Sequence, residues 1–291
     1  MELSICRGGL DDPQTTINWL LENEARIIET GPEFFLNSDD DKIASTAKLF
    51  KENGISIRSI HAPFGGNSNL SDLDAEKRRQ VVQTHRDLLY KAALADVEMI
   101  VIHPGVGGIS SQEEMDSMNL LAYESICQLM DAAEETGVVL ALENMLPNHP
   151  GCEIRHILET VEKIDSPLLG VCFDSGHAHV CGNMKEFMMA VGKHLINIHM
   201  QDNDGTRDMH LQPPYGTTDW QAFSEILQKI DYHRPITIET RPWANASYKQ
   251  MLREVSAVLE SPMDTSFRCR KCGHFILRGK SGWFCNCPED H

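Results

Sequence analysis

The sequence contains no apolar stretch long enough to cross a membrane. A membrane-spanning helix needs about 20 consecutive apolar residues, and the apolar runs of this chain are far shorter. The first residues, Met1-Glu2-Leu3-Ser4, lack both the basic start and the apolar core of a secretory signal peptide. We therefore expect a cytoplasmic protein that does not bind membranes.

Positive charge is also scarce. Lysine and arginine together number 26 against 43 aspartates and glutamates, which gives a formal net charge of −17. An acidic chain repels nucleic acids and anionic surfaces unless a local basic or metal-lined cleft attracts them. The charge therefore disfavours a nucleic-acid partner without excluding one.

Short apolar runs alternate with amphipathic stretches over the first 260 residues. Eight runs predict β-strands near residues 2–6, 26–29, 56–61, 98–103, 138–143, 168–174, 195–200 and 235–239. The intervening stretches predict helices near residues 13–23, 39–53, 74–95, 111–136, 153–164, 184–193, 219–230 and 246–260. Eight strand–helix units in about 260 residues are typical of a (β/α)8 TIM barrel. An open doubly wound sheet is the alternative, but the glycine-rich phosphate loop that would follow its first strand is absent.

Six consecutive predicted strands, from the third to the eighth, end on a side chain that can bind a metal ion. In chain order these residues are His61, His103, Glu143, Asp174, His199 and Glu239. The carboxyl ends of barrel strands form the face on which active sites are built. A carboxylate or imidazole at the end of an apolar strand is costly to bury unless it is paired or coordinated. Six of them in register predict a metal site.

Three further candidate ligands lie in loops beside these strand ends. His177 follows Asp174 by three residues, and Asp208 and His210 flank Met209, so that both would point the same way in an extended segment. Imidazoles and carboxylates without clustered thiolates suit zinc, manganese or iron better than copper(I). We expect one to three such ions in the barrel.

With these residues, the chain resembles the superfamily of xylose isomerase-like TIM barrels, which contains sugar phosphate isomerases and epimerases and endonuclease IV. The motifs that carry the resemblance are IHAPF (60–64), VIHPG (101–105), LEN (142–144), FDSGH (173–177), IHMQDNDG (198–205), DMHLQPPYG (208–216) and IET (238–240). They follow the family's order and cover essentially residues 1–260. They are specific for the superfamily rather than for one reaction.

The isomerase branch of the family implies one divalent ion, held by Glu143, Asp174, His199 and Glu239. The two glutamates would lie on opposite sides of the substrate and move a proton next to a carbonyl that the metal polarises. A metal-dependent sugar or sugar-phosphate isomerase or epimerase, with Glu143 and Glu239 as its catalytic pair, is the favoured prediction.

The endonuclease IV branch implies three zinc ions, and all nine of its ligand positions are matched. The three sets are His61, His103 and Glu143; Glu143 as a bridge with Asp174, His199 and Glu239; and His177, Asp208 and His210. Such a cluster generates hydroxide and stabilises both oxygens of a phosphoester displacement. Phosphoester hydrolysis, of abasic-site DNA or a small phosphoester and with His177 as a catalytic residue, is therefore the alternative.

The loops that would meet DNA contain few basic residues. Residues 62–73 include no lysine or arginine, and residues 202–218 include only Arg207. Endonuclease IV relies on basic and aromatic side chains in such loops to bend DNA and flip out the damaged nucleotide. A small sugar or sugar phosphate is therefore favoured over duplex DNA. A catalytically silent metal-dependent binding module is the third hypothesis, and the sequence leaves open whether the chain forms a homo-oligomer.

Four residues near other strand ends are candidate substrate contacts. Arg7 and Glu29 follow the first two strands and would touch a substrate hydroxyl or phosphate, with salt-bridging as the alternative. Arg241 and Trp243 follow Glu239 and would clamp a phosphate and stack on a sugar.

The nine cysteines are divided between two parts of the chain. Five are scattered among apolar or helical stretches, as reduced core thiols are: Cys6, Cys127, Cys152, Cys172 and Cys181. The other four fall within the last 23 residues: Cys269, Cys272, Cys285 and Cys287. This asymmetry predicts a barrel over residues 1–261 and a separate module over residues 262–291.

The predicted module pairs a CxxC motif with a CxC motif across 12 residues. Four thiolates at this spacing suit one structural zinc, as in a zinc ribbon, and the segment between them predicts a hairpin turning at residues 279–282. A ribbon usually carries CxxC on both sides, so His274 or His291 is an alternative ligand. Two disulfides are disfavoured in a reducing compartment. The sequence does not choose among folding, oligomer contact and covering the barrel mouth as the module's role.

Overall fold

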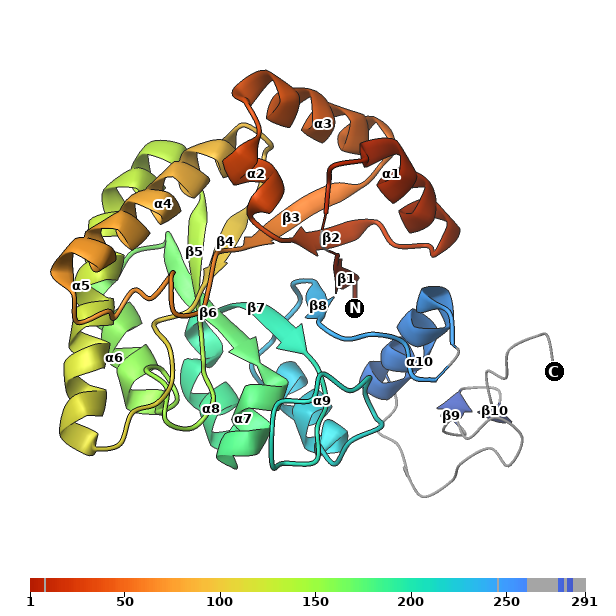
Figure 1. The fold of residues 1–291 in the computed structure, drawn as a ribbon. Coiled ribbons are helices and arrows are strands. Elements are labelled where there is room, and N and C mark those ends of the chain that lie inside the picture. Colours follow the sequence, from red (N-terminus) through yellow and green to blue (C-terminus); the bar gives the residue numbers. More distant parts are fainter. Residues whose placement is uncertain (8, 245, 261–276, 280–281, 285–291) are drawn as a thin grey trace.

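The computed structural model describes residues 1–7, 9–244, 246–260, 277–279 and 282–284. Eight parallel strands close into a barrel in chain order, with helices around the outside (Figure 1). The strands are β1 (Leu3–Cys6), β2 (Ile27–Thr30), β3 (Ser56–His61), β4 (Met99–Ile102), β5 (Val139–Glu143), β6 (Leu169–Asp174), β7 (Leu195–Met200) and β8 (Ile236–Ile238). The TIM-barrel prediction is confirmed.

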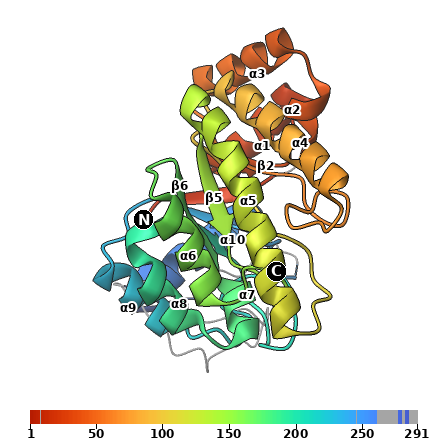
Figure 2. The same cartoon turned by 90° about the vertical axis from the view of Figure 1, so that its left-hand side faces the viewer.

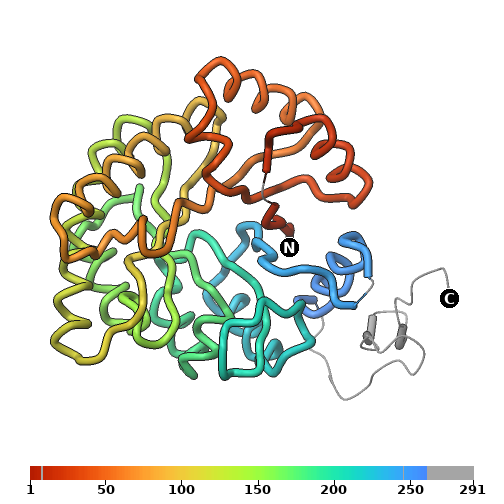
Figure 3. Tube along the Cα trace, viewed as in Figure 1, coloured from red at the N-terminus to blue at the C-terminus, as the bar shows by residue number. Residues whose placement is uncertain are grey.

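The ring closes because the last barrel strand pairs with the first. Leu3 of β1 lies opposite Ile236 of β8, and Ile5 lies opposite Ile238. The chain trace in Figure 3 shows the C-terminal part of the barrel returning beside the N-terminal strand. Closure leaves no exposed sheet edge in the barrel, and it brings the ends of β1 and β8 together on one side of the mouth, the face at the carboxyl ends of the strands.

The helices enclose the barrel as an outer layer (Figure 2). They are α1 (Pro13–Glu22), α2 (Glu33–Asn37), α3 (Asp40–Glu52), α4 (Ala75–Ala93), α5 (Gln112–Thr136), α6 (Ile154–Ile164), α7 (Ser175–Cys181), α8 (Met184–Val191), α9 (Trp220–Lys229) and α10 (Tyr248–Glu260), with a 3-10 turn at Gly192–His194. Aspartates cap several of these helices, for example Asp12 before α1, Asp39 before α3 and Asp74 before α4. Each carboxylate accepts a backbone N–H that would otherwise lack a partner at the helix start.

Two short helices were not predicted from the sequence. Helix α2 follows β2, and α7 begins directly at the end of β6, where a loop was expected. The predicted strand ends also shift by one residue in places. His61, Glu143 and Asp174 are the last residues of β3, β5 and β6, whereas His103 and Glu239 lie one residue beyond β4 and β8, and His199 is the second-last residue of β7.

Strand periodicity separates the barrel interior from the layer between strands and helices. A buried cluster of Met99, Val101, Ala141 and Cys172 fills the middle of the barrel. Successive side chains of a strand point to opposite faces, so His103, Glu143 and Asp174 share the inward face with this cluster, two residues nearer the mouth. His103, Glu143 and Asp174 therefore rest on an apolar layer, whereas His199 on β7 lies above the buried polar side chains of Glu29 and Ser59.

The predicted C-terminal module lies mostly outside the described residues. Strands β9 (Leu277–Gly279) and β10 (Gly282–Phe284) pair antiparallel, as the predicted hairpin requires. The four cysteines predicted to bind zinc, Cys269, Cys272, Cys285 and Cys287, are all outside the described residues. No helix in the described part of the chain is long and apolar enough to span a membrane.

Candidate metal centre

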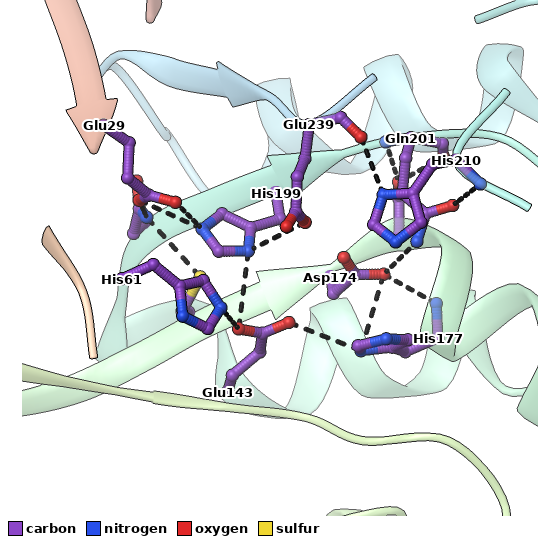
Figure 4. A network of polar contacts seen from close by, with 12 residues as sticks. Glu29, His61, Glu143, Asp174, His177, His199, Gln201, His210 and Glu239 are labelled. Atoms are coloured by element: carbon purple, nitrogen blue, oxygen red, sulfur yellow. Dashed lines mark hydrogen bonds and ion pairs between the residues drawn. The ribbon is translucent and has the colours of Figure 1, made fainter. Parts of the chain in front are cut away.

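The side chains predicted to bind metal converge at the barrel mouth. Figure 4 shows His61, Glu143, His199, Glu239, Asp174 and His177 pointing toward one another from different strands and from α7. Four of them, Glu143, Asp174, His199 and Glu239, each offer a ligand atom within 4.8 Å of the others. A second such group contains His61, Glu143 and His199. The structure therefore brings together residues that lie up to 178 positions apart, from His61 to Glu239.

Glu143 lies at the centre of the cluster. Its Oε2 is 3.2 Å from His103 Nε2, 3.4 Å from His199 Nδ1 and 3.7 Å from His61 Nε2. Its Oε1 is 3.4 Å from His177 Nδ1. Only 1% of the Glu143 side chain is exposed, so this carboxylate is surrounded by imidazoles rather than by water.

Two distances show how the cluster extends from Glu143 toward β8. His199 Nδ1 is 3.2 Å from Glu239 Oε2 as well as 3.4 Å from Glu143 Oε2. One nitrogen thus faces carboxylates from two strands. Glu239 keeps 18% of its side chain exposed, and it is the more accessible of these two carboxylates.

Most of the histidines have one ring nitrogen held by a hydrogen bond and the other facing the cluster. His61 Nδ1 donates to the Ala62 carbonyl at 3.0 Å, and His177 Nδ1 donates to the Asn144 carbonyl at 2.8 Å. His210 Nδ1 donates to the Glu239 carbonyl at 2.8 Å. Such bonds fix the ring orientation and, in the neutral ring, the tautomer, so that the second nitrogen offers its lone pair once its proton is displaced, as in metal-binding histidines.

His199 follows the same rule with a carboxylate as its partner. Its Nε2 donates to Glu29, at 3.0 Å from Oε1 and 3.1 Å from Oε2. Ser59 donates to the same carboxylate through Oγ at 2.7 Å. Glu29 is fully buried and pairs with His199, which is the salt-bridging alternative to a substrate contact. It is a buried partner that orients His199.

Several buried atoms of the cluster have no hydrogen-bond partner among the described residues. They are His103 Nε2, His199 Nδ1, Glu143 Oε2 and Asp174 Oδ2. His103 Nε2 and Glu143 Oε2 lie only 3.2 Å apart, so distance is not the reason: the angles are wrong for a hydrogen bond. Two ligands of one ion at about 2.1 Å are separated by about 3.0–3.4 Å. The residues therefore fit a bound metal ion better than they fit one another.

The third predicted ligand set lies nearer the surface. His177 Nε2 is 3.6 Å from Asp208 Oδ2, and His210 Nε2 is 3.0 Å from the same oxygen. The side chain of Asp208 is 22% exposed and that of His210 is 42% exposed. All nine predicted ligands thus lie in one connected group, with the third set at its outer edge.

Asp174 has two functions at the end of β6. Its Oδ1 accepts the backbone N–H of His177 at 2.6 Å and so caps α7, whereas Oδ2 has no partner among the described residues. The Asn144 side chain accepts from the backbone N–H of Asp174 at 2.8 Å and donates to its carbonyl at 3.0 Å. The helix cap and this reciprocal pair fix Asp174 with one oxygen left for a ligand.

Gln201 connects the deep part of the cluster to its outer edge. Its Nε2 donates to Asp208 Oδ1 at 2.5 Å and lies 3.4 Å from Asp174 Oδ1, and its Oε1 accepts the backbone N–H of His210 at 3.2 Å. A Cβ at Gly176 would lie 2.3 Å from the Gln201 side chain, so a larger residue there would displace Gln201 from these contacts. The sequence prediction missed Gln201 and Asn144. The only signal was their place beside strand-end ligands.

The protonation states of the cluster follow from burial and mutual attraction. Burial alone would lower the pKa of His61, but the Glu143 carboxylate overcomes it and raises that pKa to about 9. Burial alone would also lower the pKa of His199, but nearby acidic groups hold that pKa well above its usual value. Burial raises the pKa of Asp174 to about 7. Metal ligands must be deprotonated, so a bound cation would displace protons held on these imidazoles.

The remaining substrate candidates lie around the cluster rather than in it. Trp243 stacks on Tyr215, with ring centroids 4.7 Å apart and an interplanar angle of 11°. Its backbone N–H donates to Gln212 at 2.8 Å. Arg7 and Arg241 line one cavity beside Glu239. The structure thus leaves the two arginines at the mouth, while the Trp243 ring packs against protein.

The fold and the site together define a TIM barrel whose mouth carries a cluster of side chains that could hold a metal ion. The chain belongs to the xylose isomerase-like TIM barrel family, whose family model matches residues 17–257.

Relatives and solved structures point to both branches of this family. The uncharacterized protein MJ1311 of Methanocaldococcus jannaschii is 32% identical over 202 residues, covering 67% of this chain and 68% of its own. A protein named "Probable endonuclease 4" from Campylobacter fetus subsp. fetus is 26% identical over 220 residues, covering 68% of this chain and 76% of its own. The crystal structure of a D-tagatose 3-epimerase-like protein aligns with a TM-score of 0.76 at 25% identity, covering 89% of this chain and 98% of that one.

We predict that Glu143→Ala empties more than one metal site. Because its carboxylate lies within 3.7 Å of four imidazoles, its loss removes a ligand shared by neighbouring ions. Elemental analysis of the metal-loaded protein should show two or more barrel ions in the wild type and a loss of more than one in the variant. The surface variant Glu225→Ala is the control. Full barrel metal in Glu143→Ala would contradict the shared-ligand assignment.

We also predict that Gln201→Leu selectively weakens the outermost metal site. The substitution removes the donor to Asp208 and the acceptor for His210, and among the deep ligands it removes only a 3.4 Å contact with Asp174 Oδ1. Loss of such a supporting contact lowers metal affinity by about 10–100-fold, which chelator competition with elemental analysis would measure. Gln221→Leu, which removes an exposed amide bonded to Glu225, should change nothing. Equal loss of all ions, or of none, would show that Gln201 does not position the outer ligands.

Proposed function

We propose that the protein is a divalent-metal-dependent isomerase or epimerase of a sugar or sugar phosphate, with Glu143 and Glu239 as its acid/base pair. The observation that carries the proposal is the group of Glu143, Asp174, His199 and Glu239, whose ligand atoms lie within 4.8 Å of one another. It offers one ion four ligands and keeps two carboxylates beside the reacting carbon. Zinc, manganese and iron suit these donors.

The chain's own residues would divide the work by depth. A bound divalent ion supplies polarisation of the substrate carbonyl, which acidifies the neighbouring C–H. Glu239 is the more exposed carboxylate and would take that proton. Burial alone would raise its pKa, but His199 lowers the pKa of Glu239 to about 2, so it is ionised at neutral pH. Glu143 would return a proton to that carbon from the other side. Because the pKa of Glu143 is held well below its usual value, it would first accept this proton from a neighbouring imidazole such as His61, and Glu239 would release its own proton to solvent.

Phosphoester hydrolysis by three zinc ions is the second proposal. The observation that favours it is the outer set of His177, Asp208 and His210, which exceeds what a one-metal isomerase needs. Similarity to "Probable endonuclease 4" supports it as well. The scarcity of basic residues in loops 62–73 and 202–218 favours a small phosphoester over duplex DNA in this case. A metal-dependent binding module without catalysis is the third alternative.

Deuterium exchange tests the favoured proposal. The metal-loaded protein is incubated in deuterated water with a panel of ketoses and ketose phosphates. Deuterium should enter the substrate at the carbon next to the carbonyl, as followed by mass spectrometry and NMR. Glu239→Gln should slow exchange by about 10²–10⁴-fold, the usual contribution of a general acid or base. Glu225→Gln, an exposed position on α9, is the matched control.

An abasic oligonucleotide and a small phosphodiester test the second proposal in parallel. Cleavage that is lost in His177→Ala would replace the isomerase proposal with a hydrolase. Exchange that persists unchanged in Glu239→Gln would also reject the proposed acid/base pair. If neither assay responds while metal is bound, the binding module is left.

We propose further that residues 262–291 form a zinc-binding module that contributes to folding, attached to a barrel over residues 1–261 in a reducing cytoplasm. The four cysteine thiolates would hold one structural zinc, which contributes directly to folding free energy. Cys269→Ser combined with Cys272→Ser should lose one zinc per chain and keep the barrel ions. Unchanged zinc content would reject the module, and lost turnover with an intact barrel would place it over the active site.

A further inference from the structure

Two arginines at the junction of β1 and β8 make no ion pair with any described residue. Arg7 follows β1 and Arg241 follows β8, and both line one cavity of about 570 Å³ at the mouth. Five other described arginines are engaged in ion pairs: Arg58 and Arg234 with Glu98, Arg79 with Glu76, Arg155 with Asp116 and Arg253 with Glu24. Arg26, Arg78 and Arg86 donate to backbone carbonyls. In a chain of net charge −17, two cations without a carboxylate partner indicate a site for an anion from outside the chain.

Arg7 is held in place without satisfying its charge. Its guanidinium carbon lies 4.0 Å from the centroid of the Trp19 ring, and Trp19 in turn packs edge-on against Tyr248 at 4.7 Å. Its Nε is buried and has no hydrogen-bond partner among the described residues. A buried donor on a charged group costs free energy when it is unpaired, whereas an anion in the cavity would supply the missing acceptor.

Arg241 provides the second positive charge from the neighbouring strand. It is exposed, and it lies two residues beyond Glu239, which lines the same cavity. Arginine binds phosphate and carboxylate through parallel N–H donors. The two side chains differ in their surroundings: Arg7 is held against the Trp19 ring, whereas Arg241 is exposed to solvent.

The charges around the cavity also favour an anion. Glu239 is the only carboxylate among the described residues that line it, and this carboxylate faces His199 Nδ1 at 3.2 Å. His210 lines the cavity as well, and its Nε2 already lies 3.0 Å from Asp208 Oδ2. The cavity size lies within the range of small-molecule sites, about 300–1,000 Å³. An anionic group held here would leave the rest of its molecule beside the metal-ligand cluster.

We infer that this cavity, which we call the arginine subsite (Arg7 and Arg241), binds the anionic group of the substrate, a phosphomonoester or a carboxylate. The inference rests on the proposed function for its sugar and adds the charge of the substrate. The inference therefore favours an acidic or phosphorylated sugar, rather than a neutral one, as the substrate.

Binding measurements that need no turnover test the arginine subsite. The metal-loaded full-length protein is titrated calorimetrically with inorganic phosphate in one arm and with D-gluconate in the other. Arg7→Gln and Arg241→Gln should each weaken binding of the probe that the subsite recognises, either phosphate or gluconate, by about tenfold, as expected for a charge-assisted contact. If the affinity for phosphate depends on the two arginines, the substrate group is a phosphomonoester. If the affinity for gluconate depends on them, the group is a carboxylate.

The control lies at the opposite end of the same strand. Arg234 precedes β8 and pairs with Glu98 at 3.0 Å, so Arg234→Gln removes the same charge far from the mouth and should bind as the wild type does. Metal content and thermal midpoint are measured for every variant. A variant that combines Arg7→Gln with Arg241→Gln is measured as well. The inference would be overturned if this variant bound both probes as tightly as the wild type, or if the wild type bound neither probe. If arginine-dependent binding occurs without deuterium exchange, the subsite stands and the isomerase proposal fails.

Discussion

The rest of the site depends on the burial of one carboxylate among imidazoles. Glu143 ends β5 with 1% of its side chain exposed and with nitrogens of His61, His103, His177 and His199 within 3.7 Å. An isolated carboxylate could not remain ionised in such a place, because desolvation would raise its pKa. The surrounding histidines instead hold the pKa of Glu143 well below its usual value. The attraction is mutual, because each of these histidines is drawn toward the Glu143 carboxylate. A histidine that is to keep a lone pair for a metal must therefore be oriented by a second contact elsewhere.

That orientation comes from contacts one layer out, and each is built into the backbone or into a neighbouring strand. Carbonyls of Ala62 and Asn144 hold His61 and His177, and Glu29 holds His199 from below. Asp174 is fixed because it also caps α7. The ligands are therefore positioned before a metal arrives, which lowers the reorganisation that binding requires. This arrangement also explains why Gly176 lacks a side chain: its place is occupied by Gln201, which carries the order of the inner cluster out to Asp208 and His210.

The sequence was sufficient for the barrel and for the convergence of the nine ligands, because both follow from periodicity. Eight apolar runs define the strands, and in a parallel barrel all strand ends meet on one face. The roles of Glu29, Asn144 and Gln201 could not be predicted, since each depends on contacts with residues far away in the chain. Glu29 illustrates the difficulty. A carboxylate at the end of β2 looks like a substrate contact by position, and only the 3.0 Å distance to His199 Nε2 shows that it points inward. Helix α7 was missed because its seven residues, SGHAHVC, are stabilised by the Asp174 cap and by burial rather than by helix propensity.

The side chains of the cluster become more exposed from its inner to its outer residues, and this difference bears on both proposed functions. His199 is fully buried, Glu239 is 18% exposed, Asp208 22% and His210 42%. Desolvated ligands interact more strongly with a cation than solvated ones do, so the inner quartet should fill first and the outer set last. In the two proposed functions, the same nine side chains would present one ion to a carbonyl or three ions to a phosphoester, depending on how far the outer set fills. What then distinguishes the reactions is the substrate that the mouth admits. The walls of the mouth are set by the strand-end loops rather than by the ligands, and at the junction of β1 and β8 those walls carry two arginines without ion-pair partners among the described residues.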